Sequence, residues 1–269
     1  MPAVALDGWV YVPGGFGGEA RLERYDPAAD RWEALADMPD GRHHLMAAGY
    51  AGSLYVFGGS TPGGFNPTDS AWRYDPPSNT WSELGPMPEA RMSGAAVAMG
   101  DKIYVAGGVG ASNQMLEYTP ESGSWRVLPG PQHPRDHCNA VAFDNQVWVI
   151  GGRGAAGEEA SVEVFDPATG TWTDGPALNV ARAGFAAAVV EGQIMIGGGE
   201  VIVAGRETLD SLEILNPDTN AWQFGLPLPQ PVHGVGGAAV DGLLLLPGGS
   251  SQAGAIENAG QLQIFEPSP

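Results

Sequence analysis

Cysteine, lysine and basic charge in general are scarce in this sequence of 269 residues. The only cysteine, Cys138, cannot form a disulfide within the chain and excludes a zinc module built from cysteines. The 12 lysine and arginine residues face 31 aspartate and glutamate residues, so the formal net charge is −19. Because the chain would repel phosphate backbones and anionic lipid surfaces, we expect no nucleic-acid partner.

Long apolar stretches are also absent. No run of about 18 apolar residues occurs, and the first seven residues lack the basic start and the apolar core of a signal peptide. We therefore expect a soluble chain with no signal peptide and no membrane insertion, while the compartment stays open. Hydrophobic residues nevertheless make up 43% of the chain and include eight tryptophans, so one large β-domain can build a core.

A three-part motif recurs along the chain and indicates a repeat architecture. Each copy starts with a diglycine, and the six diglycines begin at Gly14, Gly58, Gly107, Gly151, Gly198 and Gly248. An aromatic residue or leucine, one further residue and a proline then follow, starting at Tyr25, Tyr74, Tyr118, Phe165, Leu215 and Phe265. Seven residues beyond the first five of these positions lies a tryptophan, at Trp32, Trp81, Trp125, Trp172 and Trp222.

The pattern inside each repeat is that of β-strands. The segments before the diglycines, such as 54–57 and 147–150, are short, apolar and rich in β-branched and aromatic residues, which is typical of a strand buried on both faces. The segments before these consist of small residues, such as 186–188, which suit a crowded inner strand. We name the four strands of each repeat a to d from the inside outward; the aromatic-x-Pro motif lies in c and the tryptophan in d.

These residues resemble kelch repeats, and six copies of the motif predict an all-β fold, a six-bladed kelch β-propeller of four-stranded antiparallel blades. One such domain would span residues 1–269. The blades are expected at about 1–38, 39–87, 88–131, 132–178, 179–228 and 229–269. The five motif tryptophans are expected to be largely buried between blades, where their large apolar rings would fill the gap.

The last blade is expected to be incomplete. A closed ring of equal repeats needs 32 residues between Phe265 and Gly14, whereas the chain provides 17, four after Phe265 and 13 before Gly14. We therefore predict that blade 6 lacks strand d. Its open edge would pair with a neighbouring molecule or with part of a longer protein.

All variation in repeat length falls in the loop between strands b and c, the b–c loop. From each aromatic-x-Pro motif to the next diglycine the spacing is constant at 33 residues. Insertions in repeat proteins gather on one face, often the face that binds. The junctions between strand d of one blade and strand a of the next, the d–a junctions, share that face. We expect its mouth to be the working surface, with a raised rim at 60–69, 200–210 and 250–259.

All five histidines fall in the d–a junctions of alternate blades, at His43, His44, His133, His137 and His233. His44, His137 and His233, with Asp136, could supply nitrogen and carboxylate ligands to a metal. Alternatively, the junctions are exposed polar segments around a mouth too wide for the imidazoles to meet. We favour the second interpretation and predict no metal and no cofactor.

Arginine recurs at one position of four junctions, at Arg42, Arg91, Arg135 and Arg182. A ring of guanidinium groups could bind an anion, but a side chain that caps backbone carbonyls in every repeat would recur in the same way. We favour this structural role. Cys138 aligns with apolar residues and glycine in the other repeats, which favours a buried, unreactive thiol.

In kelch domains that act as substrate adaptors, the position two residues after this arginine and the residues just after the diglycine supply much of the peptide pocket. The resemblance therefore implies binding roles for His44, Ser93, His137, Phe16, Ser60, Arg153, Glu200 and Ser250. The predicted binding set is completed by His43, Asp136, Arg206 and His233.

Two functions stay open at this point. The first is a non-enzymatic recognition module that presents the mouth to a protein, peptide or glycan partner. The second comes from the resemblance, because six-bladed kelch propellers include sialic-acid mutarotases, in which acidic and basic side chains at the mouth move a proton. Glu200, Arg153, Arg206 and His137 would then be the candidates. No motif of that activity can be matched, so no catalytic residue is predicted.

Overall fold

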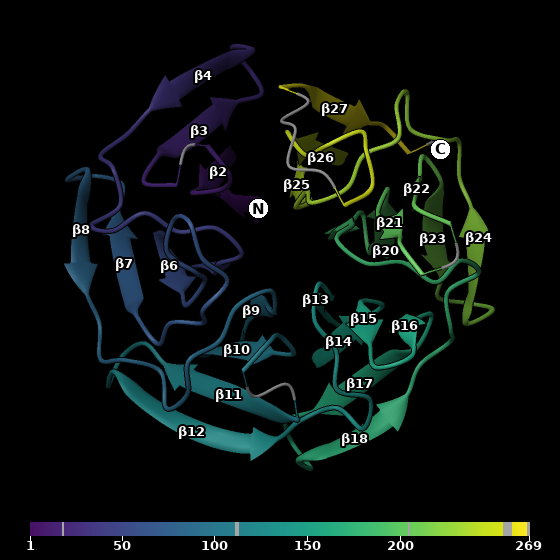
Figure 1. The fold of residues 1–269 in the computed structure, drawn as a ribbon, viewed down its shortest axis with the longest axis horizontal. Coiled ribbons are helices and arrows are strands. Elements are labelled where there is room, and N and C mark those ends of the chain that lie inside the picture. The colour runs from purple at the N-terminus through teal and green to yellow at the C-terminus, as the bar shows by residue number, and fades with distance from the viewer. Residues whose placement is uncertain (18, 111–112, 204, 255–259, 268–269) are drawn as a thin grey trace.

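The computed structural model describes residues 1–17, 19–110, 113–203, 205–254 and 260–267. These residues form strands, turns and loops, without a helix that is long and apolar enough to span a membrane. Six antiparallel sheets stand around a central axis like the blades of a propeller (Figure 1). The predicted all-β, six-bladed architecture is confirmed.

Each of blades 1 to 5 runs from its inner strand a to its outer strand d in chain order. Blade 1 comprises β1 (Val4–Leu6), β2 (Trp9–Pro13), β3 (Leu22–Asp26) and β4 (Arg31–Ala34). Blade 2 comprises β5 (Met46–Tyr50), β6 (Ser53–Phe57), β7 (Ala71–Asp75) and β8 (Thr80–Glu83). Blade 3 comprises β9 (Ala95–Met99), β10 (Lys102–Ala106), β11 (Gln114–Thr119) and β12 (Ser124–Pro129).

The second half of the ring repeats this plan. Blade 4 comprises β13 (Asn139–Phe143), β14 (Gln146–Ile150), β17 (Val162–Asp166) and β18 (Thr171–Asp174). Blade 5 comprises β19 (Ala186–Val190), β20 (Gln193–Gly197), β23 (Leu212–Asn216) and β24 (Ala221–Phe224). Two short hairpins lie in b–c loops, formed by β15 (Arg153–Gly154) with β16 (Gly157–Glu158) and by β21 (Glu200–Val201) with β22 (Glu207–Thr208).

Blade 6 contains three strands in the described part of the chain: β25 (Ala238–Val240), β26 (Leu243–Pro247) and β27 (Leu262–Phe265). β27 is strand c, and no strand d pairs with it among the described residues. In Figure 1 this blade stands between the outer strands β24 of blade 5 and β4 of blade 1. The prediction of an incomplete last blade is therefore confirmed for the described residues.

Small residues let the inner strands crowd around the axis. β5 packs beside β1 and β9, and β19 packs beside β13 and β25. At Gly237, directly before β25, a Cβ atom would come within 2.8 Å of backbone atoms of Ala187 in β19. The predicted reason for glycine and alanine in these segments, close approach of neighbouring inner strands, is thus correct.

The recurring arginines are structural. Arg182 is fully buried, and its Nη1 donates to the carbonyl oxygens of Gly198 at 2.7 Å and Ser211 at 3.0 Å, while Nη2 donates to the Glu213 carboxylate at 2.7 Å. Equivalent carbonyl contacts are made by Arg91 and Arg135. Each of these three guanidinium groups therefore ties the end of strand b to the start of strand c, as the structural interpretation predicts. Arg42 differs, because it donates to the carbonyl of Gly41 and to the hydroxyl of Ser70.

The prediction that all five motif tryptophans are largely buried is wrong. Trp222 is 6% exposed, but Trp81, Trp125 and Trp172 are only partly buried and Trp32 is 41% exposed. The physical reason is that strand d forms the outer edge of each blade. Its tryptophan covers the flank of the preceding blade with one face and meets solvent with the other.

Candidate functional site

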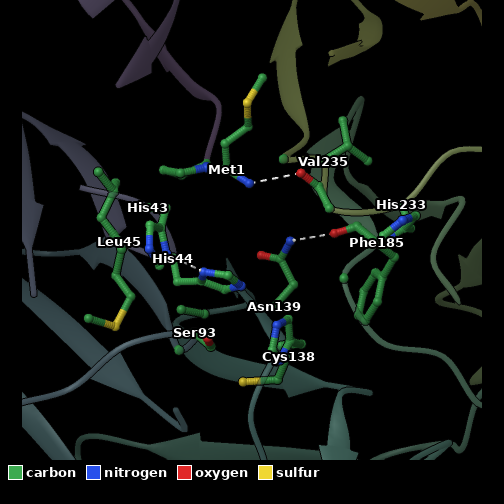
Figure 2. A pocket seen from close by; sticks show the side chains of 18 of the residues that line it. Met1, His43, His44, Leu45, Ser93, Cys138, Asn139, Phe185, His233 and Val235 are labelled. Carbon is green, nitrogen blue, oxygen red and sulfur yellow. Dashed lines mark hydrogen bonds between the residues drawn. The ribbon is translucent and has the colours of Figure 1, made fainter. Parts of the chain in front are cut away.

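A pocket of about 470 Å³ opens at the mouth, where the b–c loops and d–a junctions meet. Every blade contributes to its wall, through Phe16, His44, Ser93, His137, Gly184 and His233 among others. Figure 2 shows His43 and His44 on one side of the pocket and His233 and Phe185 on the opposite side.

Short backbone bridges bring the two predicted groups of residues together. In each case the residue after the junction arginine, or its equivalent, pairs with the residue after the diglycine. These antiparallel bridges join His43 to Ser60, Met92 to Val109, Asp136 to Arg153, Ala183 to Glu200 and His233 to Ser250. The repeat architecture therefore places one junction residue and one b–c loop residue side by side in five blades.

A ring of backbone hydrogen bonds holds the residues at the next junction position. The N–H of Ser93 donates to the carbonyl of His44 at 2.8 Å, and that of His137 to Ser93 at 2.6 Å. The series continues through Gly184 and Gly234. His44, Ser93 and His137 have φ values of 55°, 59° and 49°, a left-handed conformation that costs an L-residue roughly 1–2 kcal/mol. The ring of backbone hydrogen bonds holds the three residues in this strained conformation and so fixes their side chains at the pocket wall.

The wall on the side of blades 1 and 2 is aromatic. Phe16 stacks on His43 with ring centroids 4.5 Å apart and meets His44 edge-on at 5.1 Å. Phe65 contacts the same two imidazoles, at 5.4 and 5.6 Å. The Nδ1 atoms of His43 and His44 lie 2.7 Å apart, so one donates to the other. We call Phe16, His43, His44 and Phe65 the aromatic wall.

The aromatic wall keeps its imidazoles neutral at pH 7. Burial lowers the pKa of His44 to about 3, and the nearby His137, the amino terminus and His43 add to this effect. Burial also lowers the pKa of His43. Hydrogen bonds to backbone carbonyls and the charge of Glu19 oppose this effect but do not outweigh it. The two imidazoles therefore present uncharged ring surface to the pocket.

The opposite wall is charged and centres on Glu200, which is buried. One carboxylate oxygen accepts a hydrogen bond from Arg153 at 2.8 Å. The other accepts one from the N–H of Gly254 at 2.7 Å and lies 3.2 Å from Nδ1 of His233. Arg153 also donates to Glu158 at 3.0 Å. We call Arg153, Glu158, Glu200 and His233 the charged wall.

Between the two walls, His137 is hydrogen-bonded through Nδ1 to the carboxylate of its neighbour Asp136. The buried Ser93 hydroxyl makes no hydrogen bond with the described residues. Asn139 donates to the carbonyl of Phe185 at 3.2 Å across the floor (Figure 2). Burial raises the pKa of Cys138 to about 11, in agreement with the predicted unreactive thiol.

The histidines proposed as metal candidates do not converge. The rings of His44 and His137 lie 5.2 Å apart, whereas His233 lies across the pocket and binds Glu200. Within the described ranges, no three histidine, cysteine, aspartate or glutamate side chains are placed to hold a metal ion. Of the candidate ligands, His137 binds Asp136 and His233 binds Glu200.

Several predicted residues lie at the edge of the pocket or away from it. His133 is exposed, with Nδ1 at 3.9 Å from Glu163, and Arg206 is exposed in the b–c loop of blade 5. The hydroxyls of Ser60 and Ser250 are buried and accept hydrogen bonds from the backbone of their own loops. Of the predicted rim, residues 204 and 255–259 lie outside the described residues.

Among the lining residues outside the predicted binding set are Phe65, which lies within the predicted rim, and Asn139 and Phe185. Phe65 could have been predicted from the sequence, because an aromatic residue in a long b–c loop cannot pack into the core of a blade. Asn139 and Phe185 lie at and just before the start of inner strands, where the sequence reads as core. Only their position beside the axis brings them to the pocket floor.

The ring of diglycine-marked blades with a loop-lined mouth defines the class of six-bladed kelch propellers. A protein-family model described as "KLHDC2/KLHL20/DRC7 Kelch-repeats domain" matches residues 85–249, which is more than half of the chain. A second family model, described as "Kelch motif", matches residues 42–88. The chain therefore belongs to the kelch-repeat family, which at the family level is one of protein-interaction modules.

Among curated proteins, Kelch-like protein 35 of Mus musculus is 45% identical over 60 residues, and that of Homo sapiens is 40% identical over 58 residues. These matches span 21% and 20% of this chain and about a tenth of the length of each relative. A solved structure titled "Structure of YjhT" superposes with a TM-score of 0.86 at 18% identity, over 98% of this chain and 93% of that one. At this identity the likeness shows a shared fold.

Proposed function

We propose that this propeller binds a segment of a partner protein across its mouth, with a partner side chain seated in the central pocket. The observation that carries the proposal is the exposure of apolar side chains on the b–c loops beside the pocket: Phe65 is 64% exposed and Val203 is 68% exposed. Large apolar side chains left in solvent around a hollow are typical of surfaces that a protein partner covers.

The two walls favour different parts of such a segment. The aromatic wall offers uncharged ring surface to an aliphatic or aromatic side chain. The other side of the pocket carries three carboxylates, those of Asp136, Glu158 and Glu200, but only one guanidinium group, that of Arg153. Burial would raise the pKa of Glu158, but hydrogen bonds from Arg153 and from the backbone lower it, so this carboxylate is ionised at neutral pH. In a chain of net charge −19, this arrangement favours a segment that combines an apolar residue with a basic one.

A sugar isomerase is the second candidate, and a glycan partner would use the same charged wall. The observation in its favour is that Glu200, Arg153 and His137 meet in one pocket, as acid–base chemistry requires. Against it, both oxygens of Glu200 already accept hydrogen bonds, from Arg153 and from the N–H of Gly254. The Asp136 contact engages only Nδ1 of His137, so His137 alone would have to supply the base that the reaction needs. We therefore favour recognition.

The experiment is selection of a random 12-residue peptide library displayed on phage against the immobilised protein. We expect the selected peptides to be enriched in lysine or arginine together with aromatic or large aliphatic residues. Their affinity should fall at least tenfold for the variant Phe65→Ser/Val203→Ser, because the apolar rim is lost. The matched control is Asp101→Ala/Asp144→Ala, two exposed positions in the a–b turns at the opposite mouth, which should leave binding unchanged.

Recognition through the mouth would be contradicted by peptides that bind both variants equally or that lose affinity only with the control variant. The alternative is measured separately by proton NMR exchange spectroscopy on sialic acid. Acceleration of anomer exchange by the wild-type protein, abolished by Glu200→Gln, would favour the sugar isomerase instead.

A further inference from the structure

One repeat position of the pocket wall carries side chains in some blades and none in others. It lies two residues after the junction arginine, or its equivalent in blade 6, and is occupied by His44, Ser93, His137, Gly184 and Gly234. We call these five residues the collar. A Cβ atom at Gly234 would meet no atom within 4 Å, and one at Gly184 would meet only the backbone of Gly234. The collar therefore encloses an empty slot on the side of blades 5 and 6.

The hydrogen bond to Asp136 decides what the imidazole of His137 can offer to a ligand. A carboxylate can only accept, so the proton of the neutral imidazole is on Nδ1, which faces Asp136. The other ring nitrogen, Nε2, then carries a lone pair, and none of the described residues donates to it. His137 therefore contributes a hydrogen-bond acceptor without a partner to the collar.

His44 contributes a second acceptor, because His43 fixes the position of its proton. The ring of His43 donates to the backbone carbonyls of Gly64 and Thr61, which uses the one N–H of a neutral imidazole. In the contact of 2.7 Å between the two Nδ1 atoms, His43 is then the acceptor and His44 the donor. Nε2 of His44 is left with a lone pair. Figure 2 shows the His44 ring extending toward the middle of the pocket.

Ser93 lies between these two histidines in the collar and is the third polar group. Its N–H donates to the carbonyl of His44 and its carbonyl accepts from the N–H of His137, so the backbone holds it in place. The residue is 6% exposed, and its hydroxyl makes no hydrogen bond with the described residues. A buried hydroxyl without a partner destabilises the unliganded protein, and a ligand that bonds to it removes this cost.

The neighbouring carboxylates attract a cation but do not suit a guanidinium group. Asp136 holds His137 through one oxygen, and the two oxygens of Glu200 accept from Arg153 and from the N–H of Gly254. A guanidinium binds best as a planar fork on a carboxylate with both oxygens free, which neither residue provides. An ammonium group instead directs three donors from one nitrogen toward separate acceptors. The collar offers three single acceptors of this kind.

We propose that the collar binds the ammonium group of an unmodified lysine side chain, which donates to Oγ of Ser93 and to Nε2 of His44 and His137. This inference rests on the proposed recognition of a partner segment and names the residue that enters the pocket. The methylene groups of the lysine would pack against the aromatic wall. Acetylation of the lysine removes the charge and two of the three donors, so the collar would reject the acetylated side chain.

The probe is the capped amino acid Nα-acetyl-lysine methylamide, titrated into nitrogen-15-labelled protein at pH 8 and followed by NMR. At this pH the lysine ammonium is charged and a free imidazole is neutral. We expect saturable binding of one molecule, with shifts of the amide signals of Ser93 and His137. The norleucine analogue, which lacks the ammonium group, should bind at least tenfold more weakly. The analogues of arginine, Nε-acetyl-lysine and Nε-trimethyl-lysine should be weakened at least as much.

Two protein variants test the collar itself. Gly234→Asn places a side chain in the empty slot, and asparagine tolerates the left-handed φ of 65°. It should weaken lysine binding at least tenfold, and Ser93→Ala should weaken it at least fivefold. The matched control is Gly192→Asn, because Gly192 has a φ of 78° and a Cβ there also meets nothing, but it lies in an a–b turn at the opposite mouth. This variant should bind lysine like the wild type.

Equal binding of the lysine and norleucine analogues overturns the lysine site, as does wild-type affinity in Ser93→Ala and Gly234→Asn. Equal binding of the trimethylated analogue also overturns it, because the aromatic wall would then hold the cation without hydrogen bonds. The proposed function fails separately. Lysine binding without any selected peptide would contradict peptide recognition and leave the collar site standing, whereas selected peptides without a preference for lysine over norleucine would do the reverse.

Discussion

Glu200 and Arg153 join two neighbouring blades at the pocket wall: the carboxylate in β21 of blade 5 accepts a hydrogen bond from the guanidinium in β15 of blade 4 at 2.8 Å. The two residues lie 47 positions apart, one repeat length. Each sits directly after its diglycine, so the repeat places an acid beside a base although no local motif pairs them.

Replacing Glu200 by glutamine should destabilise the protein by about 1–3 kcal/mol, because Arg153 and His233 lose a buried charged partner while Arg153 keeps Glu158. Urea unfolding followed by fluorescence measures the change. Glu207→Gln, at an exposed position of the adjacent strand β22, is the matched control and should stay within about 0.5 kcal/mol. Equal effects of the two substitutions would show that the charged wall contributes little to stability.

Stability should decrease on acidification through His44. In the unfolded chain this imidazole titrates near pH 6.5, whereas in the folded protein its pKa is about 3, so between these values the unfolded state binds the extra proton. The contribution of His44 is complete above pH 6.5 and is lost as the pH falls toward 3. Between pH 7 and 5 the wild type should lose about 1–2 kcal/mol more than His44→Asn, since asparagine tolerates the left-handed backbone.

The comparison is made by urea unfolding of both proteins at the two pH values. Asparagine cannot titrate, so the difference between the proteins isolates His44 from the other acidic and basic groups. Parallel loss of stability in wild type and variant would contradict a depressed pKa at this site.

Combined replacement of His44 and His137 by asparagine should reduce the affinity for mouth-binding peptides at least tenfold, because their rings pack edge to face, with centroids 5.2 Å apart, in the pocket wall. Fluorescence anisotropy with labelled peptides measures the affinity, and circular dichroism checks that the variant is folded. The variants Asp101→Ala and Asp144→Ala again provide the control. Normal binding by the double variant would place the interaction surface elsewhere.

The motif tryptophans should differ in their contribution to stability according to their burial. Trp222→Ala removes a buried ring and an indole hydrogen bond and should cost roughly 3–5 kcal/mol. Trp32→Ala removes a ring that is 41% exposed and should cost about 1–2 kcal/mol. The denaturant midpoints of the two variants show which substitution costs more stability. Equal midpoints would contradict the predicted difference.

Much of the fold could be predicted because the repeat supplies six independent copies of the same evidence. Diglycines, aromatic-x-Pro motifs and tryptophans define the blades, and the constant spacing of 33 residues identifies the variable loops. The structural role of Arg182 was also predictable, since a side chain that serves the repeat recurs with it. The exposure of Trp32 was not, because burial depends on which strand precedes the tryptophan in the ring.

The candidate site could be predicted only in outline. Periodicity placed His44, His137 and Glu200 at one mouth because the connections of all blades return to the same face. It could not tell that His44 joins Phe16 and Phe65, or that His233 binds Glu200. Those contacts depend on the conformation that each loop adopts at the mouth of the central channel.

The sequence by itself therefore determined the blades and the face that carries variation, since both follow from spacing along the chain. Only the tertiary structure decided which side chains meet. Closing the ring brings residues of all six blades to one pocket, and burial there makes one wall uncharged while ion pairs hold the other. Desolvation and pairing depend on distances in space, which no spacing along the chain specifies.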